Sequence, residues 1–555
     1  MNAAVLSLVL FTFVVGMAGL LVLIWSITRQ RSDWSHHGAR VIFDAGEEGL
    51  VEEPASASEH DVRALERHAN PSTVSAPPGR AAEAVEARRI GDISSRAPVL
   101  GFLWSALFWL LFGSLLGLTA SLKMTFPDWL TAHAPLTFGR IRPMHLNTVV
   151  YGWASMASIA VALWLMPRLT RTPLAGGRVA VWGVRVWNAG LVLGTGALAF
   201  GWTDGVEWLE LPWPADALLV IGGGMAGFPL ILTLCRRKTR SIYVSAWYLG
   251  AAFLWFPILF FVANLPGQHF GVEHATVNWW FAHNVLGLWV TPIGLAIAYY
   301  LIPKVLGRPV FSYSLSLIGF WSLALFYSQV GLHHLIGGPV PTWLITISIV
   351  HSIMMFVPVV AVAINHHWTM VGRFSTLRYS PTLRFVVLGA MMYTLTSLEG
   401  SIEALRSVNR VTHFTHFTVA HAHFGMYGFV SFELFGAIYF LLPRLAEREW
   451  PYPRLIRAHF WLSLTGIGVY VVALSIGGVL QGLAMLDAAR PFIDSVSVTL
   501  PYLHARTAGG LLMTLAHLVF GYHFVVMATG RGPVRVSTPW AQDIRPPVSE
   551  SAVTS

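Results

Sequence analysis

Thirteen apolar stretches, each long enough to cross a membrane, are the feature that most constrains this chain. Crossing the hydrocarbon core takes about 20 apolar residues in a helix. Within lipid, only helices and closed barrels can satisfy their own backbone polar groups. The stretches therefore predict an all-α, polytopic membrane protein. They lie near residues 3–28, 98–122, 143–166, 179–201, 214–235, 241–263, 277–303, 311–332, 341–365, 382–404, 416–442, 456–481 and 505–529.

The composition agrees with a bilayer as the solvent of this fold. Of the 555 residues, 55% are hydrophobic and 11% are Asp, Glu, Lys or Arg, whereas an average soluble protein has about 25% charged residues. This balance excludes global disorder and argues against nucleic-acid binding and against a soluble multi-domain enzyme. The single cysteine, Cys235, cannot form an internal disulfide. Without a C-x-x-C-H motif, the chain carries no c-type haem of its own.

Four segments follow one another along the chain. Residues 1–33 have neither a basic n-region nor a small-residue cleavage site, so we interpret them as a transmembrane anchor rather than a signal peptide. Residues 34–97 are polar and hold no catalytic or metal-binding motif, and their composition predicts a flexible cytoplasmic linker. Residues 98–530 are expected to form a membrane domain of twelve helices. Residues 531–555 are expected to form a cytoplasmic tail.

The basic residues predict the orientation of the helices. Lys and Arg number nineteen in the connections on one side of the predicted membrane and seven on the other. Basic residues are retained on the cytoplasmic side, so the N-terminus is predicted to lie outside and the linker and C-terminus inside. The net charge of +9 therefore mostly reflects membrane topology. No internal repeat is evident from the sequence.

Several of the 22 histidines lie within or at the ends of apolar stretches. Ionisable groups at membrane depth are costly and usually line a pathway or bind something. His421 and His423 are two residues apart and point about 200° apart on a helix, so each can reach a different iron on either flank. The pair therefore predicts two haems beside one helix. The spacing leaves open which histidine serves which haem.

A second group of histidines predicts a copper site. His333 and His334 are adjacent at a helix end and can turn toward one ion, and His283 can supply a third imidazole. Three imidazoles with an open position suit copper. His145, at the outer start of another helix, is a candidate opposite ligand for one of the two haems. Six histidines would then hold one closed haem for electron relay, one open haem and one copper that together bind a diatomic gas.

These motifs resemble those of the haem–copper oxidase superfamily, specifically the catalytic subunit I of cbb3-type (C-family) cytochrome c oxidases. The similarity covers roughly residues 98–530, and the motifs occur in the family's order. The resemblance implies the twelve-helix oxidase core as the catalytic membrane domain, with one extra N-terminal helix. The matching stretches are residues 138–145, 280–284, 309–316, 327–334, 399–400, 407–409 and 420–423.

The resemblance also implies two b-type haems, one copper ion and a role for each histidine. His421 is implied on the high-spin haem, and His145 and His423 on the low-spin haem. Copper is assigned to the three remaining candidates, His283, His333 and His334. Arg140 and Arg142 beside His145 can pair with haem propionates.

A redox-active phenol and a proton path are expected with these metals. Tyr327 matches the family's tyrosine that is linked covalently to a copper histidine, here His283. The path residues that match the family are Thr291, Tyr313, Ser316 and Tyr393. Gly319 departs from the pattern, because the family often has a histidine there.

A calcium site is a further expectation from the family. Glu207 and Glu210 resemble an acidic pair that approaches calcium near the propionates, with Glu207 as the ligand. A solvated loop is the alternative interpretation of this pair. His416 is another departure, because the family usually carries an acid there.

The function implied is that of a terminal respiratory oxidase subunit in a bacterial inner membrane. It would reduce O2 to water with electrons from cytochrome c, through c-type cytochrome subunits or soluble cytochrome c, and translocate protons. One alternative is a nitric oxide reductase of the same superfamily. Another is a non-catalytic haem-binding membrane protein. The absence of acids between His283 and Lys304, together with Tyr327, favours the oxidase. The segment that follows the first predicted helix, residues 25–44, is weakly similar to a one-helix maturation protein of these oxidases.

Overall fold

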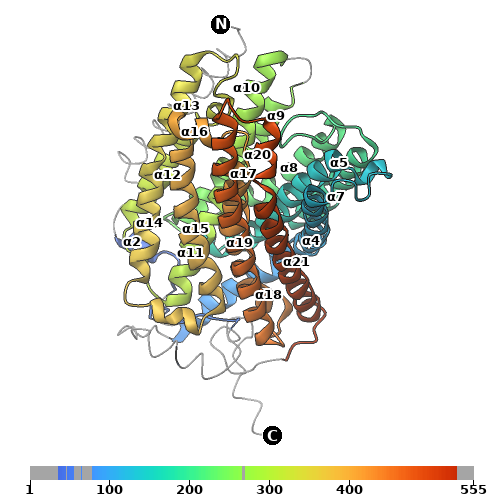
Figure 1. Cartoon of the computed structure of the whole chain (residues 1–555). Coiled ribbons are helices and arrows are strands. Elements are labelled where there is room, and N and C mark those ends of the chain that lie inside the picture. Colours follow the sequence, from blue (N-terminus) through green and yellow to red (C-terminus); the bar gives the residue numbers. More distant parts are fainter. Residues whose placement is uncertain are drawn as a thin grey trace.

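The helices of this computed structural model run roughly parallel in one bundle (Figure 1). The structure describes residues 36–44, 47–49, 51–55, 64, 78–265 and 269–533. In these residues it contains helices and no strand, apart from one isolated bridge between Val206 and Leu209. The all-α prediction is therefore confirmed.

The twelve stretches predicted after residue 98 all coincide with helices. Eleven helical spans in the described residues are long and apolar enough to cross a membrane, and the twelfth stretch forms the 24-residue helix α7. The stretch near 3–28 lies outside the described residues. The first helices are α2 (His36–Arg40), α4 (Pro78–Thr125), α5 (Phe138–Asn147), α6 (Ser155–Thr170), α7 (Gly177–Phe200), α8 (Trp213–Cys235), α9 (Val244–Ala263), α10 (Gly271–Val285) and α11 (Thr291–Leu306). They are followed by α12 (Tyr313–Tyr327), α13 (Thr342–Met354), α14 (Phe356–Met370), α15 (Pro381–Glu403), α16 (Arg406–Thr412), α17 (His416–His423), α18 (Phe432–Ala446), α19 (Pro453–Leu486), α20 (Phe492–Ser497) and α21 (Leu500–Ala528).

Three spans form the interior of the bundle. In Phe138–Thr170, Gly271–Leu306 and His416–Ala446, 89% or more of the apolar window is buried, against 56% or less in the other spans. Each is interrupted by a π-helical turn: η2 (Thr148–Ala154), η3 (Leu286–Val290) and η6 (Phe424–Ser431). Such turns occur mostly at functional sites. All three spans carry candidate metal-binding histidines just before the turn.

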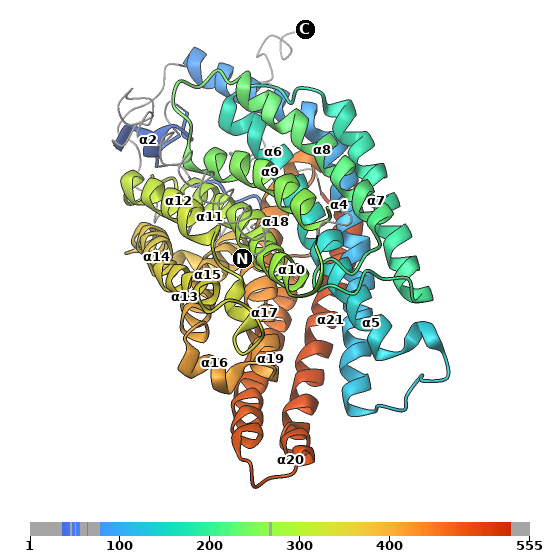
Figure 2. The same ribbon diagram turned by 90° about the horizontal axis from the view of Figure 1, so that it is seen from above.

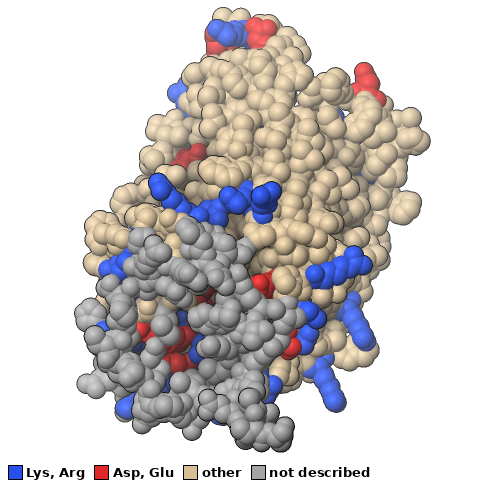
Figure 3. Space-filling view, turned by 90° about the horizontal axis from the view of Figure 1, so that it is seen from below, with Lys and Arg blue, Asp and Glu red and all other residues tan. Residues whose placement is uncertain are grey.

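The same three spans end alike, which reveals an internal repeat that the sequence alone did not suggest. They close on Pro167-Arg168, Pro303-Lys304 and Pro443-Arg444. All three cations are buried, with 8%, 3% and 1% of their surface exposed. We call this end of the bundle, where Arg168, Lys304 and Arg444 lie, the basic end. Figure 3 views the molecule from below and shows further Lys and Arg side chains on that face.

Acids from the segment before residue 98 neutralise these buried cations. Asp92 pairs with Arg168 at 2.7 Å and Glu47 with Lys304 at 2.5 Å, and Glu52 pairs with Arg444. The described parts of residues 34–97 are therefore held against the bundle. Residues 78–97 are also helical, as the first part of α4. The prediction of a flexible linker is wrong for these parts, because ion pairs with buried cations replace the apolar burial that the segment lacks.

Replacing Glu52 is expected to destabilise the protein. Burial acts to raise the pKa of Glu52, but the charges of Arg444, Lys304 and Arg168 outweigh it and lower the pKa from 4.5 to about 2. The ionised carboxylate therefore stabilises the fold at neutral pH, and that contribution is lost as the pH falls from 4.5 toward 2. Glu52→Gln should cost about 3–5 kcal/mol, because Arg444 stays buried without its partner. A lower thermal unfolding midpoint at pH 7 is the measurement.

Glu48→Gln is the matched control for this prediction. Glu48 pairs with Arg40, and their side chains are 37% and 61% exposed. Exposed ion pairs contribute only about 0–1 kcal/mol. Equal unfolding midpoints for the two variants would contradict a structural role for the Glu52 pair.

Candidate metal and haem centre

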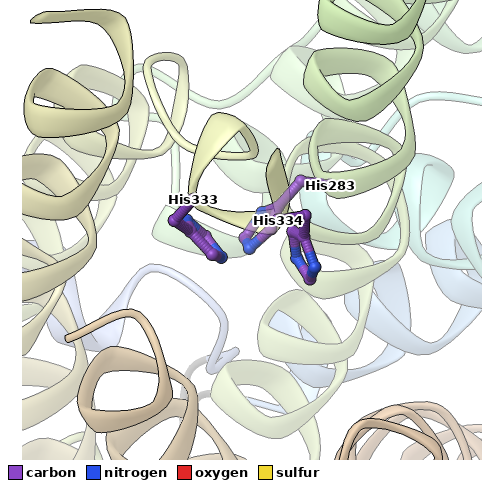
Figure 4. Close-up of side chains that lie close together, drawn as sticks. All are labelled: His283, His333 and His334. Carbon is purple, nitrogen blue, oxygen red and sulfur yellow. The ribbon is translucent and has the colours of Figure 1, made fainter. Parts of the chain in front are cut away.

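Three histidines converge on one point between α10 and η4 (Leu332–Leu335) (Figure 4). One ring nitrogen each of His283, His333 and His334 lies within 4.8 Å of the other two. Nitrogen ligands of one ion lie about 2 Å from it and at most about 4 Å apart. Shifts of less than about 1 Å would therefore bring all three onto one metal. In the described part of the chain, no other group of three His, Cys, Asp or Glu side chains meets this criterion.

The short helix η4 reaches this position because of Gly331. Its φ of +119° is available to glycine and rare for other residues. A Cβ on Gly331 would lie 2.4 Å from the carbonyl oxygen of Trp279 in α10. The chain can therefore pass closely over α10 and place His333 and His334 beside His283.

The surroundings of the three rings favour metal binding. The Nδ1 atom of His333 lies 3.2 Å from the Ser348 hydroxyl and 3.0 Å from the Ser352 hydroxyl, which leaves Nε2 for a ligand. His334 stacks on Trp279 with ring centroids 4.3 Å apart. The Nδ1 atom of His283 is buried without a hydrogen-bond partner in the described residues. A buried imidazole nitrogen without a partner, beside two oriented imidazoles, fits the ligand set of a copper ion.

Tyr327 lies beside this cluster. Its ring centroid is 5.2 Å from that of His283. The ring occupies the place of a side chain at Gly287 in η3, where a Cβ would lie 1.6 Å from Cε1 of Tyr327. The π-helical turn and the glycine together admit the phenol next to His283.

His145 and His423 face one another as the two ligands of a closed haem would. Their ring centroids are 6.3 Å apart and their planes differ by 15°. Two imidazoles on opposite faces of one iron have centroids about 6 Å apart, given nitrogen–metal distances of about 2 Å. Each Nδ1 lies close to a backbone carbonyl, Gly113 at 2.8 Å and Val419 at 2.9 Å. Such contacts fix the rings so that Nε2 can bind a metal.

His421 has different neighbours from His423. Its Nδ1 lies 3.1 Å from a carboxylate oxygen of Glu399 and 4.0 Å from one of Glu403, both on α15. Gly400 leaves room for the imidazole, because a Cβ there would lie 2.9 Å from its Cε1. A carboxylate on Nδ1 orients a histidine ligand and strengthens its other nitrogen as a donor. The two histidines of the H-x-H motif therefore have separate supports, as the spacing predicts.

The predicted propionate and calcium residues have other partners in the structure. Arg140 donates to the Ala199 carbonyl at 2.9 Å. Arg142 pairs with Glu207 at 2.7 Å. Glu210 is buried and accepts from Asn147, and burial, followed by the charge of Glu207, raises its pKa to about 7. The calcium role of Glu207 and the propionate roles of the arginines stay predictions.

The predicted proton-path residues lie in several helices. Tyr313 donates to the Ile242 carbonyl at 2.8 Å and Ser316 to the Tyr313 carbonyl at 2.6 Å. Thr291 begins α11 directly after η3, and the Tyr393 ring packs on Phe429 with centroids 4.9 Å apart. A Cβ on Gly319 would lie 3.5 Å from the Tyr248 hydroxyl. This hydroxyl is buried without a partner in the described residues. The path stays a prediction.

Two residues near His423 were missed by the sequence interpretation. The Tyr470 hydroxyl lies 3.3 Å from Nε2 of His423, and Arg506 donates to that hydroxyl at 3.2 Å. Arg506 is 9% exposed. An arginine at the start of an apolar stretch was the available signal, because intramembrane charges usually mark a site.

The fold and the three groups of histidines define a polytopic membrane protein built to hold metals between its central helices. Comparison with known proteins gives the family. Residues 97–512 match the family of cytochrome c and quinol oxidase polypeptide I. The chain belongs to this family, the subunit I of haem–copper oxidases, and this confirms the resemblance. The match covers most of the membrane domain predicted for residues 98–530.

Relatives and a solved structure agree with this assignment. The Cbb3-type cytochrome c oxidase subunit CcoN1 of Stutzerimonas stutzeri is 32% identical over 75% of this chain and 91% of its own length. A cytochrome c oxidase subunit 1 homolog of Azorhizobium caulinodans is 33% identical over 78% and 82%. A nitric oxide reductase chain of Stutzerimonas stutzeri is more distant, at 25% over 77% and 93%. A haem–copper terminal oxidase dimer solved by cryo-electron microscopy shares the fold with a TM-score of 0.66 at 16% identity, over 80% of this chain and 86% of that one.

Proposed function

We propose that this chain is the catalytic subunit of a cbb3-type cytochrome c oxidase that reduces O2 to water and translocates protons. The observation that carries the proposal is the cluster of three imidazoles within 4.8 Å with the Tyr327 phenol beside His283. A relay haem or a transport protein needs neither feature. The reaction consumes one O2, four electrons and four protons and yields two waters.

The histidines would hold two b-type haems and one copper ion. His145 and His423 would bind the low-spin haem, and His421 the high-spin haem. The copper would be bound by His283, His333 and His334. When bound, the high-spin haem and the copper supply electrons to O2.

The protein's own side chains then position the site and move protons. Ser348 and Ser352 hold the His333 ring, and Glu399 holds His421. Tyr327 would donate the hydrogen of its hydroxyl, as a proton and an electron, toward O2. This electron is needed because the high-spin haem and the copper alone cannot supply all four. Protons would reach Tyr327 from the basic end through Tyr313, Ser316, Thr291 and Tyr393.

Electrons would arrive from c-type cytochrome subunits or soluble cytochrome c, since the sequence has no c-type haem motif. The protein would lie in the bacterial inner membrane with the basic end and the C-terminus in the cytoplasm and the N-terminus outside. The histidines would then lie toward the outer side, because His283 precedes Lys304 by about 30 Å of helical rise. The membrane domain 98–530, the anchor 1–33 and the tail 531–555 are proposed on the same grounds.

Metal analysis and turnover of the purified complex test this function. We expect two haems and one copper per chain, O2 consumption with reduced cytochrome c, and little NO reduction. Iron in place of copper with NO turnover would support the nitric oxide reductase instead. Two haems without copper and without turnover would support a non-catalytic haem protein.

A further inference from the structure

Three buried histidines of α19 and α21 take no part in the centre described above. His459, His517 and His523 are 0%, 5% and 0% exposed. Histidines at membrane depth are costly unless they serve a purpose. With three hydroxyl side chains they form a row of neighbouring polar groups, which we call the histidine file. In order from the basic end, its members are His523, Tyr439, His459, Ser463, Tyr427 and His517.

The lower part of the file begins at the loop between α18 and α19. The backbone N–H of Tyr452 donates to His523 at 3.4 Å. The Tyr439 ring lies 6.4 Å from the His523 ring, and the Tyr439 hydroxyl lies 3.0 Å from Nδ1 of His459. Nδ1 of His523 and Nε2 of His459 are buried without partners in the described residues. Such nitrogens are sites where water or a proton can bind.

The upper part of the file surrounds His517 with hydrogen-bond acceptors. Its Nδ1 lies 2.6 Å from the Ser114 hydroxyl and its Nε2 lies 3.1 Å from the Tyr427 hydroxyl. Ser114 donates its hydrogen to the Leu110 carbonyl at 2.6 Å, and Tyr427 donates its hydrogen to Ser463 at 3.1 Å. If both hydroxyls accept from the ring, as these two bonds allow, His517 satisfies both contacts as an imidazolium with a hydrogen on each nitrogen. If the Ser114 hydroxyl donates to Nδ1 instead, the neutral ring also satisfies both contacts, so this environment accommodates either protonation state.

His517 contacts one residue close to each candidate ligand of the low-spin haem, Ser114 near His145 and Tyr427 near His423. Ser114 follows Gly113, whose carbonyl contacts Nδ1 of His145. Tyr427 follows His423 by four residues, about one helical turn. The titratable groups near His517 are Tyr427 of η6 and, toward the basic end, His459 of α19. From α4 it is faced by the Ser114 hydroxyl.

We propose that His517 takes up one proton from the basic end, through His523 and His459, for each electron that the site of His145 and His423 receives. An added electron is costly in a low-dielectric interior unless a positive charge accompanies it. The proton adds to the neutral imidazole to give the imidazolium, and no other bond changes. This inference rests on the proposed function only for the position of the low-spin haem.

Redox titration of the low-spin haem in the purified complex, at a series of pH values, tests the proposal. In the unaltered protein the midpoint potential should fall as the pH rises. His517→Gln keeps a polar side chain but cannot bind the proton, so the slope should drop by at least half. His459→Gln should leave the equilibrium slope unchanged but slow proton uptake after rapid reduction at least tenfold, as a pH-indicator dye would report. His504→Gln, at an exposed position on the same helix α21, should change neither quantity.

Two results would overturn the proposal. One is an unchanged slope in His517→Gln with an intact low-spin spectrum. The other is a negative result in an infrared experiment, which decides the question if His517→Gln fails to assemble its haem. Infrared difference spectra of the unaltered protein with isotope-labelled histidine should show imidazole converting to imidazolium on reduction, and absence of that signal would refute the role. O2 turnover separates failure of this inference from failure of the proposed function. If the inference fails while turnover is normal, the proposed function still holds.

Discussion

Tyr327→Phe should lower O2 reduction by at least about 100-fold while the haem spectra stay unchanged. The substitution removes one hydroxyl from a ring 5.2 Å from His283, and loss of a positioned proton donor costs about 100-fold or more. The histidines keep their supports, so metals should still bind. Turnover with cytochrome c, measured alongside optical spectra, checks this result. Tyr522→Phe, at an exposed position on α21, is the matched control, and normal turnover in Tyr327→Phe would exclude the phenol from the reaction.

Gly287→Ala provides a second test of the same phenol without removing any polar group. The added methyl group would lie 1.6 Å from the Tyr327 ring, so the ring must move away from His283. We expect turnover to fall here as well. Gly224→Ala in α8, where an added Cβ meets nothing within 4 Å, should retain it.

His145→Ala should abolish the low-spin haem spectrum. His145 and His423 would be the two axial ligands, and their parallel rings 6.3 Å apart leave space for one iron between them. Without one imidazole, the haem should be lost or become high-spin. Low-temperature absorption and electron paramagnetic resonance spectra distinguish these outcomes.

His133→Ala is the matched control for the axial ligand. His133 lies in the loop between α4 and α5, exposed and twelve residues before His145. The haem spectrum of the His133→Ala variant should match that of the unaltered protein. A low-spin signal that survives in His145→Ala would show that another residue is the ligand.

Much of the fold could be predicted because it depends on local composition. The twelve stretches after residue 98 have helical length and apolar content, and a bilayer leaves little alternative to helices. The candidate copper residues could also be predicted, because His333 and His334 are adjacent and His283 stands out within an apolar stretch. The structure then brings their nitrogens within 4.8 Å of one another.

What the sequence could not predict depends on contacts between distant residues. The pairing of Glu52 with Arg444 joins residues almost 400 positions apart, and composition alone predicted a flexible segment. The histidine file from His523 to His517 arises only when α18, α19 and α21 pack together. The repeated ends at Arg168, Lys304 and Arg444 were visible as letters, but their equivalence became clear only from their common burial at one end of three central spans.

The three buried cations also impose an order on biosynthesis. Glu47, Glu52 and Asp92 leave the ribosome before any of their partners, and Arg444 is made last, in α18. In the view from above, the elements that carry these partners, α6, α11 and α18, lie next to one another (Figure 2). Asp92 can pair with Arg168 once α6 has been made, whereas Glu47 and Glu52 have no partner until α11 and α18 follow. The segment before residue 98 therefore cannot complete its ion pairs until most of the membrane domain has been translated.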